Sequence, residues 1–261
     1  MYSFHIDTNG TIPLKEIDES FDNVKFSVSL SEQNDHNYLR CSLLFDSFQT
    51  IIENLNNLKN PQNRIAIRYN VNHNNIDAFR KFVEFIKENV PCVYNIDPMY
   101  TDNYAKNKLF TNKLSQKEFS KWNSSIAIDI LIANEFVITG GISSALQLCV
   151  AYQPYSCKVH ASGFVTLCDG MEYRELLHID ELSRNVKLLD QAYQKYKDYN
   201  PLNSEKCAMC EKVIQCQGEI FCRKNCCEYQ KRYNEEEFIK TYVKYVLMGK
   251  ENFFVGIIFL N

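Results

Sequence analysis

Hydrophobic and polar residues alternate along two segments of the first part of the chain, and alternation with a period of two predicts β-strands. The segments are residues 24–30, with Val24, Phe26, Val28 and Leu30 on one face, and residues 65–71, with Ile65, Ile67, Tyr69 and Val71. Residues 2–7 and 92–96 are also predicted strands, and the turn Thr8-Asn9-Gly10 closes the first of them.

Two segments between these strands place apolar residues three or four positions apart, which predicts helices with one face packed on a sheet. The first helix covers residues 44–58 and the second residues 76–89. The predicted inward side chains are Leu44, Phe48, Ile51, Ile52, Leu55, Leu58, Phe79, Phe82, Val83 and Ile86. The order strand, strand, helix, strand, helix, strand favours parallel βαβ units over an antiparallel sandwich, so we predict an α/β fold.

The alternation of predicted strands and helices ends after Asp97. Ser115 and Glu118 have the spacing of a capping box, and residues 124–137 are a predicted helix. Residues 158–168 are a predicted hairpin that turns at Ser162-Gly163. Residues 182–199 are also expected to be helical. The last predicted elements are a helix that begins near Asn234, with Phe238, Tyr242 and Val246 inward, and a strand over residues 253–260.

The composition is that of a globular protein and excludes intrinsic disorder. The chain has 261 residues, of which 45% are hydrophobic and 23% charged, and its formal net charge is −3. It contains no apolar run of membrane-spanning length and no secretory signal, so we expect a cytoplasmic protein without a membrane partner. The acidic balance, without basic runs, favours no nucleic-acid partner. The abundance of Asn is interpreted as base composition.

Eleven cysteines need an explanation, and six of them fall between residues 207 and 227. These six are Cys207, Cys210, Cys216, Cys222, Cys226 and Cys227. In a reducing compartment such a cluster favours metal binding over disulfides. The Cys-x2-Cys spacing places two thiolates at one metal centre, which suits zinc or an iron–sulfur cluster. Zinc would use four of the six and would leave the upstream cysteines unexplained.

A second cysteine pattern lies upstream. Cys149 is followed after thirteen residues by Gly163, and Cys168 follows after four more. Cys157, on the same hairpin, suits either a core position or a ligand position. The two patterns together resemble the SPASM domain, the cluster-binding C-terminal extension of many radical S-adenosylmethionine (SAM) enzymes. Five residues separate Cys216 from Cys222, where that family usually has three.

The resemblance implies two auxiliary [4Fe-4S] clusters. The first would be held by Cys149, Cys168 and Cys222, with Cys157 as fourth ligand or with an open iron site. The second would be held by Cys207, Cys210, Cys216 and one of Cys226 and Cys227. Cys41 and Cys92, which lie outside both patterns, are expected to be buried in the core.

The first part of the chain resembles the middle of a radical SAM barrel, because Ser29-Leu30-Ser31 ends a strand and the stretch from His36 to Arg40 precedes a helix. The resemblance implies that Ser29 and Arg40 lie near the SAM carboxylate or the substrate. It also places Arg68 and Asn72 among the polar groups that face the site. His36 could face the cleft, but its polar neighbours favour a surface position.

The radical SAM motif Cys-x3-Cys-x2-Cys is absent, so no catalytic residue is assigned and SAM would bind only if a missing N-terminal region were supplied. The resemblance then leaves two interpretations. One is a truncated maturase that acts on a ribosomally made precursor peptide. The other is a non-catalytic, cluster-bearing partner of the precursor peptide or of a full-length maturase. A zinc-binding structural module is a third alternative.

The predicted organisation therefore has four parts. Residues 1–108 form a partial radical SAM-type barrel, residues 109–148 a helical connection, residues 149–233 a SPASM domain, and residues 234–261 a C-terminal helix and strand.

Overall fold

The computed structural model describes residues 4–40, 46–60, 63–100, 114–139, 157–160, 162–166, 177–184, 187, 205–209 and 234–255. The chain divides into two compact units. Unit 1 comprises residues 1–141 and 231–257, and unit 2 comprises residues 142–230 and 258–261.

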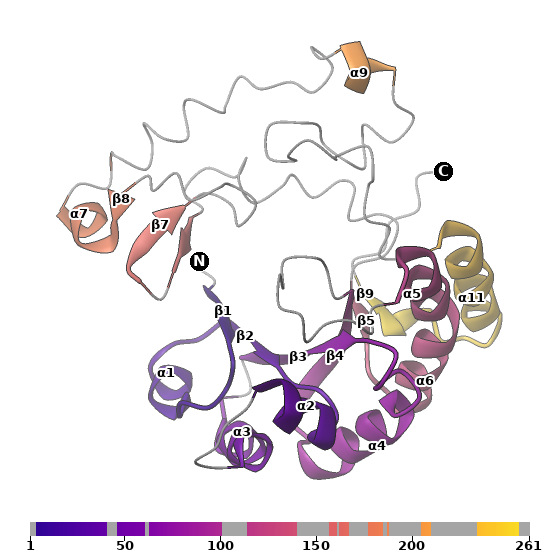
Figure 1. Cartoon of the computed structure of the whole chain (residues 1–261), viewed down its shortest axis with the longest axis horizontal. Helices are drawn as coiled ribbons and strands as arrows, with labels where there is room; N and C mark the ends of the chain where they lie inside the picture. Colours follow the sequence, from indigo (N-terminus) through magenta and orange to yellow (C-terminus); the bar gives the residue numbers. More distant parts are fainter. Residues whose placement is uncertain are drawn as a thin grey trace. The chain divides into compact units, whose positions relative to one another are not determined.

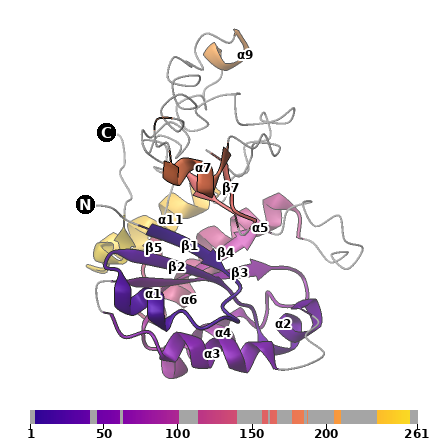
Figure 2. The same cartoon turned by 90° about the vertical axis from the view of Figure 1, so that its left-hand side faces the viewer.

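Unit 1 is built on a four-stranded parallel sheet in which the strands follow one another in chain order (Figure 2). The strands are β1 (Phe4–Thr8), β2 (Val24–Ser29), β3 (Arg64–Val71) and β4 (Val93–Tyr100). Every adjacent pair is parallel. The predicted α/β class and the predicted parallel βαβ units are therefore confirmed.

One face of this sheet is covered by helices α1 (Lys15–Ser20), α3 (Ser47–Asn56) and α4 (Phe79–Asn89), as Figures 1 and 2 show. The side chains predicted to face inward on α3 and α4 are buried wherever the structure describes them. Leu44 lies outside the described residues. The buried side chains pack against Phe26, Val28 and Ile67 of the sheet, none of which is exposed. Removing such side chains from water contributes about 1.5–3 kcal/mol each and is the main force that holds the helices to the sheet.

Two short helices were not predicted. In α1, the carboxylate of Asp18 is 1% exposed and accepts the backbone N–H groups of Lys59 and Asn60 at 2.7 and 2.9 Å. This buried carboxylate fastens the helix to the connection between α3 and β3. Helix α2 (Gln33–Arg40) occupies the stretch that includes His36. His36 is 2% exposed and packs near Phe48, so its predicted surface position is wrong.

The next helical segment is continuous, where a capping box at Ser115 and another helix over residues 124–137 were predicted. It runs without a break through α5 (Gln116–Trp122), the π-helical turn η1 (Asn123–Ala127) and α6 (Ile128–Ala133). The predicted capping box is present, since the Ser115 hydroxyl accepts the Glu118 N–H and the Glu118 carboxylate accepts the Ser115 N–H. The segment ends short of residue 137, where Glu135 adopts a left-handed φ of 64°.

Two short parallel strands complete unit 1. They are β5 (Ile138–Thr139) and β9 (Phe254–Val255), and α11 (Glu235–Leu247) and η5 (Glu251–Phe253) precede β9. The predicted C-terminal helix is confirmed, with Asn234 as its N-cap and Phe238 fully buried. Val246, predicted to face inward, is 40% exposed. Residues 256–260 of the predicted last strand lie outside the described residues.

In unit 2 the structure describes a three-stranded antiparallel sheet of β6 (Lys158–Val159), β7 (Phe164–Thr166) and β8 (Leu177–His178). The predicted hairpin is β6 and β7, and it turns where expected. Helix α7 (Ile179–Arg184) follows β8, and α9 (Glu205–Ala208) is a separate short helix. Most of the predicted helix 182–199 lies outside the described residues.

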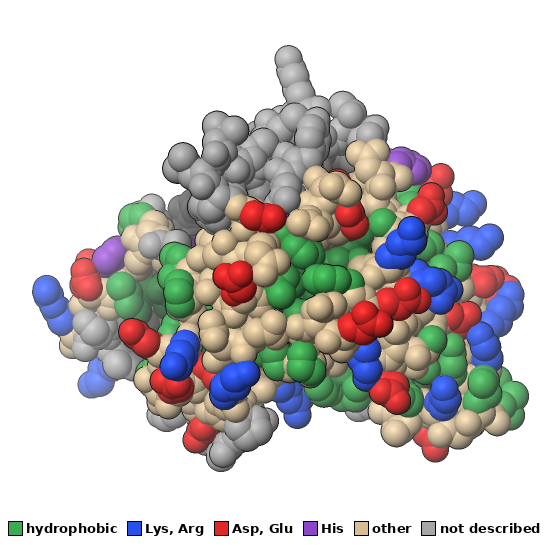
Figure 3. Space-filling model, turned by 90° about the horizontal axis from the view of Figure 1, so that it is seen from below, with side chains coloured by type: hydrophobic (Ala, Val, Ile, Leu, Met, Phe, Trp, Pro, Cys, Tyr) green, Lys and Arg blue, Asp and Glu red, His purple; other side chains and the backbone are tan. Residues whose placement is uncertain are grey.

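Acidic and basic side chains are interspersed over the surface shown in Figure 3, as the small net charge leads one to expect. None of the helices that the structure describes is both long enough and apolar enough to span a bilayer.

Candidate functional site

The sheet face opposite α1, α3 and α4 carries a row of polar side chains. In parallel strands, residues paired across the ladder point to the same face. Asp7 pairs with Ser27, and Ser29 pairs with Arg68, which in turn pairs with Asp97. The alternation that buries Phe26 and Val28 under the helices therefore gathers hydroxyl, carboxylate and guanidinium groups on the other face, which we call the polar face.

Asp7 is the centre of the contacts on the polar face. Its Oδ1 lies 3.0 Å from an Arg68 guanidinium nitrogen and 3.3 Å from His5 Nε2. The Asp7 and Arg68 side chains are each 32% exposed, so their ion pair joins β1 to β3 across β2 but contributes at most about 1 kcal/mol. Ser27, which is 3% exposed, places its Oγ 2.7 Å from the same His5 nitrogen.

This arrangement is not a nucleophilic triad. In a triad the imidazole takes a proton from the hydroxyl through one ring nitrogen and is held by the carboxylate through the other. Here Ser27 and Asp7 both approach Nε2 of His5, so the carboxylate cannot support proton removal from Ser27 through the ring. The polar face is consequently suited to binding and orienting a polar ligand rather than to acyl transfer.

Asn95 adds a buried amide to the polar face. It lies beside Ala66 in the ladder and is 1% exposed. Its Nδ2 donates to Thr139 Oγ1 at 3.1 Å, which links β4 to β5. Its Oδ1 has no hydrogen-bond partner among the described residues. A buried acceptor without a donor is costly, which makes this oxygen a place where a ligand or water donor would be stabilising.

A second polar cluster lies where β3 ends. The Asp35 carboxylate accepts from Nδ2 of Asn75 at 2.7 Å and from Nδ2 of Asn72 at 3.3 Å, and all three residues are buried. The Tyr69 hydroxyl donates to the Asn75 carbonyl at 2.9 Å. Burial, with the charges of Asp35 and Glu32 nearby, raises the pKa of Tyr69. Asn75 Nδ2 also donates to the Asn70 carbonyl at 2.8 Å, so this buried cluster stabilises the loop after β3.

The residues assigned by resemblance are found in different places. Ser29 is half-buried on the polar face beside Arg68. Arg40 is the last residue of α2, and its side chain lies outside the described residues. Asn72 belongs to the buried cluster after β3. His5, Asp7 and Asn95 were not predicted from the sequence. For His5 and Asp7 a signal was present, because they alternate with apolar residues in the first strand.

Most of the predicted cluster ligands lie outside the described residues. These are Cys149, Cys168, Cys210, Cys216, Cys222, Cys226 and Cys227, together with the side chain of Cys207, whose backbone is in α9. Cys157 is described: it is half-buried directly before β6, and burial raises the pKa of its thiol. Within the described part of the chain, no three His, Cys, Asp or Glu side chains are grouped to hold a metal ion.

Gly163, the glycine of the upstream pattern, is required by more than backbone conformation. Its φ is +85°, a region that favours glycine. A Cβ at this position would also clash with the imidazole ring of His178 on β8. The turn therefore depends on glycine both for its own conformation and for the approach of the third strand.

No family model matches the chain, and a search of curated proteins found no significant match.

Proposed function

We propose that this chain is an iron–sulfur protein related to the radical SAM maturases of ribosomally made peptides. The observation that carries the relation to these enzymes is the parallel sheet with strands in chain order and helices on one face (Figure 2), while the register of the strands places polar residues on the other face. The cysteine spacing supports it independently, because it resembles a SPASM domain.

The strand order and the position of the helices favour a segment of a β/α barrel rather than a doubly wound sheet. In a β/α barrel the strands keep chain order and every crossover helix lies outside. A doubly wound sheet instead reverses its strand order and carries helices on both faces. The order β1-β2-β3-β4 with α1, α3 and α4 on one face agrees with the barrel arrangement. The polar face would then be the barrel interior, with Ser29 near bound SAM or substrate.

The two clusters would be held by the ligand sets that the resemblance implies, in unit 2. Thiolates are soft ligands that suit iron–sulfur clusters, and the six cysteines between residues 207 and 227 are more than the four that one zinc site would use. Cys157 joins the first set only if its thiol is deprotonated on binding, because burial alone favours the neutral form. When bound, the clusters would anchor the peptide or accept an electron.

The precursor peptide is the proposed binding partner, and a full-length maturase is a second one. Without Cys-x3-Cys-x2-Cys the chain lacks the ligands of the cluster that cleaves SAM. Its own residues would therefore bind and orient: Arg68 and Asp7 offer one charge of each sign on the polar face, and Asn95 Oδ1 offers a buried acceptor.

The test is metal analysis of the full chain after anaerobic purification. We expect about eight irons and eight sulfides per chain, with visible absorption from the clusters. The Cys210→Ala variant should lose about half of this iron, because Cys210 is assigned to one cluster of two. Stoichiometric zinc without visible absorption would overturn the proposal in favour of a zinc module.

Cys92→Ala is the matched control. Cys92 lies outside both cysteine patterns, and its Sγ donates to the Leu55 carbonyl at 3.4 Å in unit 1. This variant should keep the full iron content. If Cys210→Ala also kept it, the assignment of Cys210 would be wrong.

A further inference from the structure

We propose that the polar face binds an amide group of a peptide over Ala66, between the side chains of Ser27 and Asn95. The strand register pairs Ser27 with Ala66 and Ala66 with Asn95, so these three residues form one row across β2, β3 and β4. An amide brings one N–H donor and one carbonyl acceptor, and the row supplies a partner for each. The precursor peptide as the source of this amide rests on the proposed function, whereas the amide chemistry follows from the row itself.

Asn95 supplies the acceptor. It is 1% exposed, and its Oδ1 has no hydrogen-bond partner among the described residues. Its Nδ2 already donates to Thr139 Oγ1 at 3.1 Å, so Oδ1 is the atom that a ligand must satisfy. A buried neutral oxygen favours an uncharged N–H donor, because an ammonium group would lose its hydration here without gaining a negative partner.

Ser27 supplies the donor. Its Oγ lies 2.7 Å from His5 Nε2, and the same nitrogen lies 3.3 Å from the Asp7 carboxylate. An ionised carboxylate accepts hydrogen bonds and donates none, so the nitrogen that faces it carries the proton. Ser27 Oγ then accepts from His5, and its own hydroxyl proton is available to a ligand carbonyl.

Ala66 contributes only a Cβ to the middle of the row. The next residue of β3 on this face, Arg68, pairs with Asp7 of β1 at 3.0 Å and so extends away from Asn95 on β4. Neighbouring strands lie about 4.8 Å apart, which separates the Ser27 and Asn95 backbones by about 10 Å. An amide hydrogen-bonded at both ends spans about 8 Å between its partner atoms, so one amide matches the width of the row.

Exposure on the polar face rises from β4 toward β1. Asn95 and Ser27 are buried, whereas the His5 side chain is 49% exposed. A peptide that enters from the β1 side would place one amide in the buried part of the face. A ligand without an N–H would leave the Asn95 oxygen unpaired there, and a buried polar group left unpaired is the strongest basis for rejecting an analogue.

The experiment is NMR spectroscopy of the isotope-labelled full chain, purified anaerobically, with small amides titrated into it. N-methylacetamide represents a peptide group and acetamide a side-chain carboxamide. At least one of them should shift the Ala66 backbone amide saturably, with a dissociation constant in the millimolar range. The tighter of the two identifies the source of the amide. Methyl acetate, which has the carbonyl but no N–H, should bind at least about tenfold more weakly.

Two variants remove one partner each. Asn95→Leu lacks the acceptor and Ser27→Ala lacks the donor, so each should weaken amide binding at least about fivefold. The matched control is Asn134→Leu, because the Asn134 amide donates to the Ile130 carbonyl at 2.9 Å at the end of α6, outside the polar face. It should leave the affinity unchanged. Trp122 fluorescence checks that each variant is folded.

The proposal would be overturned by equal affinity for methyl acetate and N-methylacetamide, or by the absence of a saturable shift with either amide. Unchanged affinity in both folded variants, Asn95→Leu and Ser27→Ala, would also overturn it. Iron content is measured separately on the same sample. Amide binding by a chain without iron would therefore reject only the cluster chemistry, and iron without amide binding would reject only the amide site.

Discussion

Single residues show why particular amino acids stand at the turns of this chain. Gly163 combines a φ of +85° with a close approach to the His178 ring, which also stacks edge-on against Phe164 at 5.6 Å. The Gly163 carbonyl accepts the Ile179 N–H at 2.8 Å. This one position therefore fixes the geometry of β6, β7 and β8 together.

Gly163→Ala should loosen the hairpin of unit 2. The left-handed backbone costs an L-residue about 1–2 kcal/mol, and the clash with His178 adds to it. We expect amide hydrogen exchange in residues 157–166 to become at least about tenfold faster, measured by mass spectrometry on the intact chain.

Gly249→Ala is the matched control for Gly163. Its φ is +68°, yet a Cβ there would meet nothing within 4 Å. Only the backbone cost should appear, as a smaller acceleration of exchange near residue 249. In a second variant, Gly163→Ala with His178→Ala, the clash is removed, so exchange should be slower than in Gly163→Ala alone. Equal exchange in Gly163→Ala and the unmodified chain would contradict the proposed role of His178.

Several asparagines form hydrogen bonds that join segments far apart in the chain. Asn63 Oδ1 accepts the Val24 N–H at 2.8 Å at the start of β2, and Asn60 Nδ2 donates to the Asp18 carbonyl at 3.0 Å. These partners are about 40 positions apart in the chain, so no local pattern could identify them.

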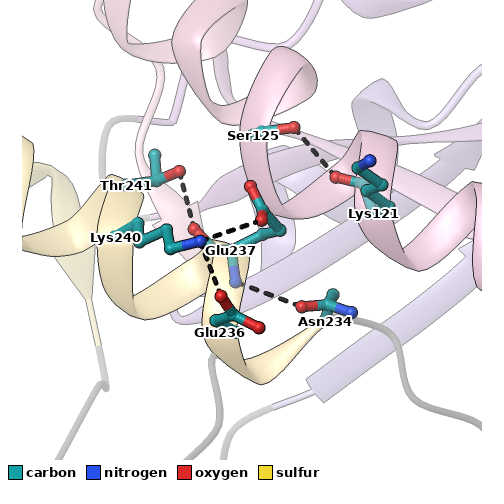
Figure 4. A network of polar contacts seen from close by, with 7 residues as sticks. All are labelled: Lys121, Ser125, Asn234, Glu236, Glu237, Lys240 and Thr241. Carbon is teal, nitrogen blue, oxygen red and sulfur yellow. Dashed lines mark hydrogen bonds and ion pairs between the residues drawn. The ribbon is translucent and has the colours of Figure 1, made fainter.

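At the scale of elements, the π-helical turn η1 explains how α11 is anchored. The Ser124 hydroxyl, fully buried, donates to the Ser120 carbonyl at 2.7 Å and accepts the Asn234 N–H at 2.6 Å. Asn234 is also the N-cap of α11, since its Oδ1 accepts the Glu237 N–H, as Figure 4 shows. The start of one helix is thus bonded to an irregular turn of another, a use of π-turns that regular periodicity does not reveal.

Ser124→Ala should destabilise unit 1 by about 1 kcal/mol, because it removes the shorter of the two bonds of the Asn234 N–H and leaves only the Ser120 carbonyl at 3.2 Å as acceptor. The chain has a single tryptophan, Trp122, which precedes η1 and reports on this region. Urea unfolding followed by its fluorescence should show a lower midpoint with an unchanged slope.

Ser125→Ala is the control for this bond. The Ser125 hydroxyl donates only to Lys121, four residues earlier in the same helical segment, at 2.9 Å (Figure 4). Its loss should leave stability unchanged within about 0.5 kcal/mol, since alanine favours a helix. Equal effects of the two variants would show that α11 does not depend on Ser124.

Elements with a strong period were predictable, and those held by distant contacts were not. The β2 and β3 alternation and the inward faces of α3 and α4 follow directly from residue spacing. The short α1 has no such period and is fastened by the Asp18 carboxylate. Val246 follows Phe238 and Tyr242 at four-residue spacing, yet it is 40% exposed.

At the scale of the whole molecule, the two units differ in what holds them together. Unit 1 has a sheet and helices with a continuous apolar core, which periodicity predicts. The cysteine-rich part of unit 2 has little periodicity, so its organisation was inferred from ligand spacing. The polar face was only half predicted: Ser29 and Arg68 were singled out by resemblance, while the ion pair of Arg68 with Asp7 depends on strand order.

Removal of the proposed clusters should therefore destabilise unit 2 and leave unit 1 folded. If metal binding supplies the folding free energy of the cysteine-rich region, stripping iron with a chelator should speed proteolytic cleavage within residues 142–230. Unit 1 has its own core, so the free energy of unfolding in urea, followed by Trp122 fluorescence, should stay within about 0.5 kcal/mol of the loaded protein's value. Reloading iron and sulfide should restore the resistance to protease. A parallel fall in the Trp122 midpoint would instead mean that the clusters stabilise unit 1 as well.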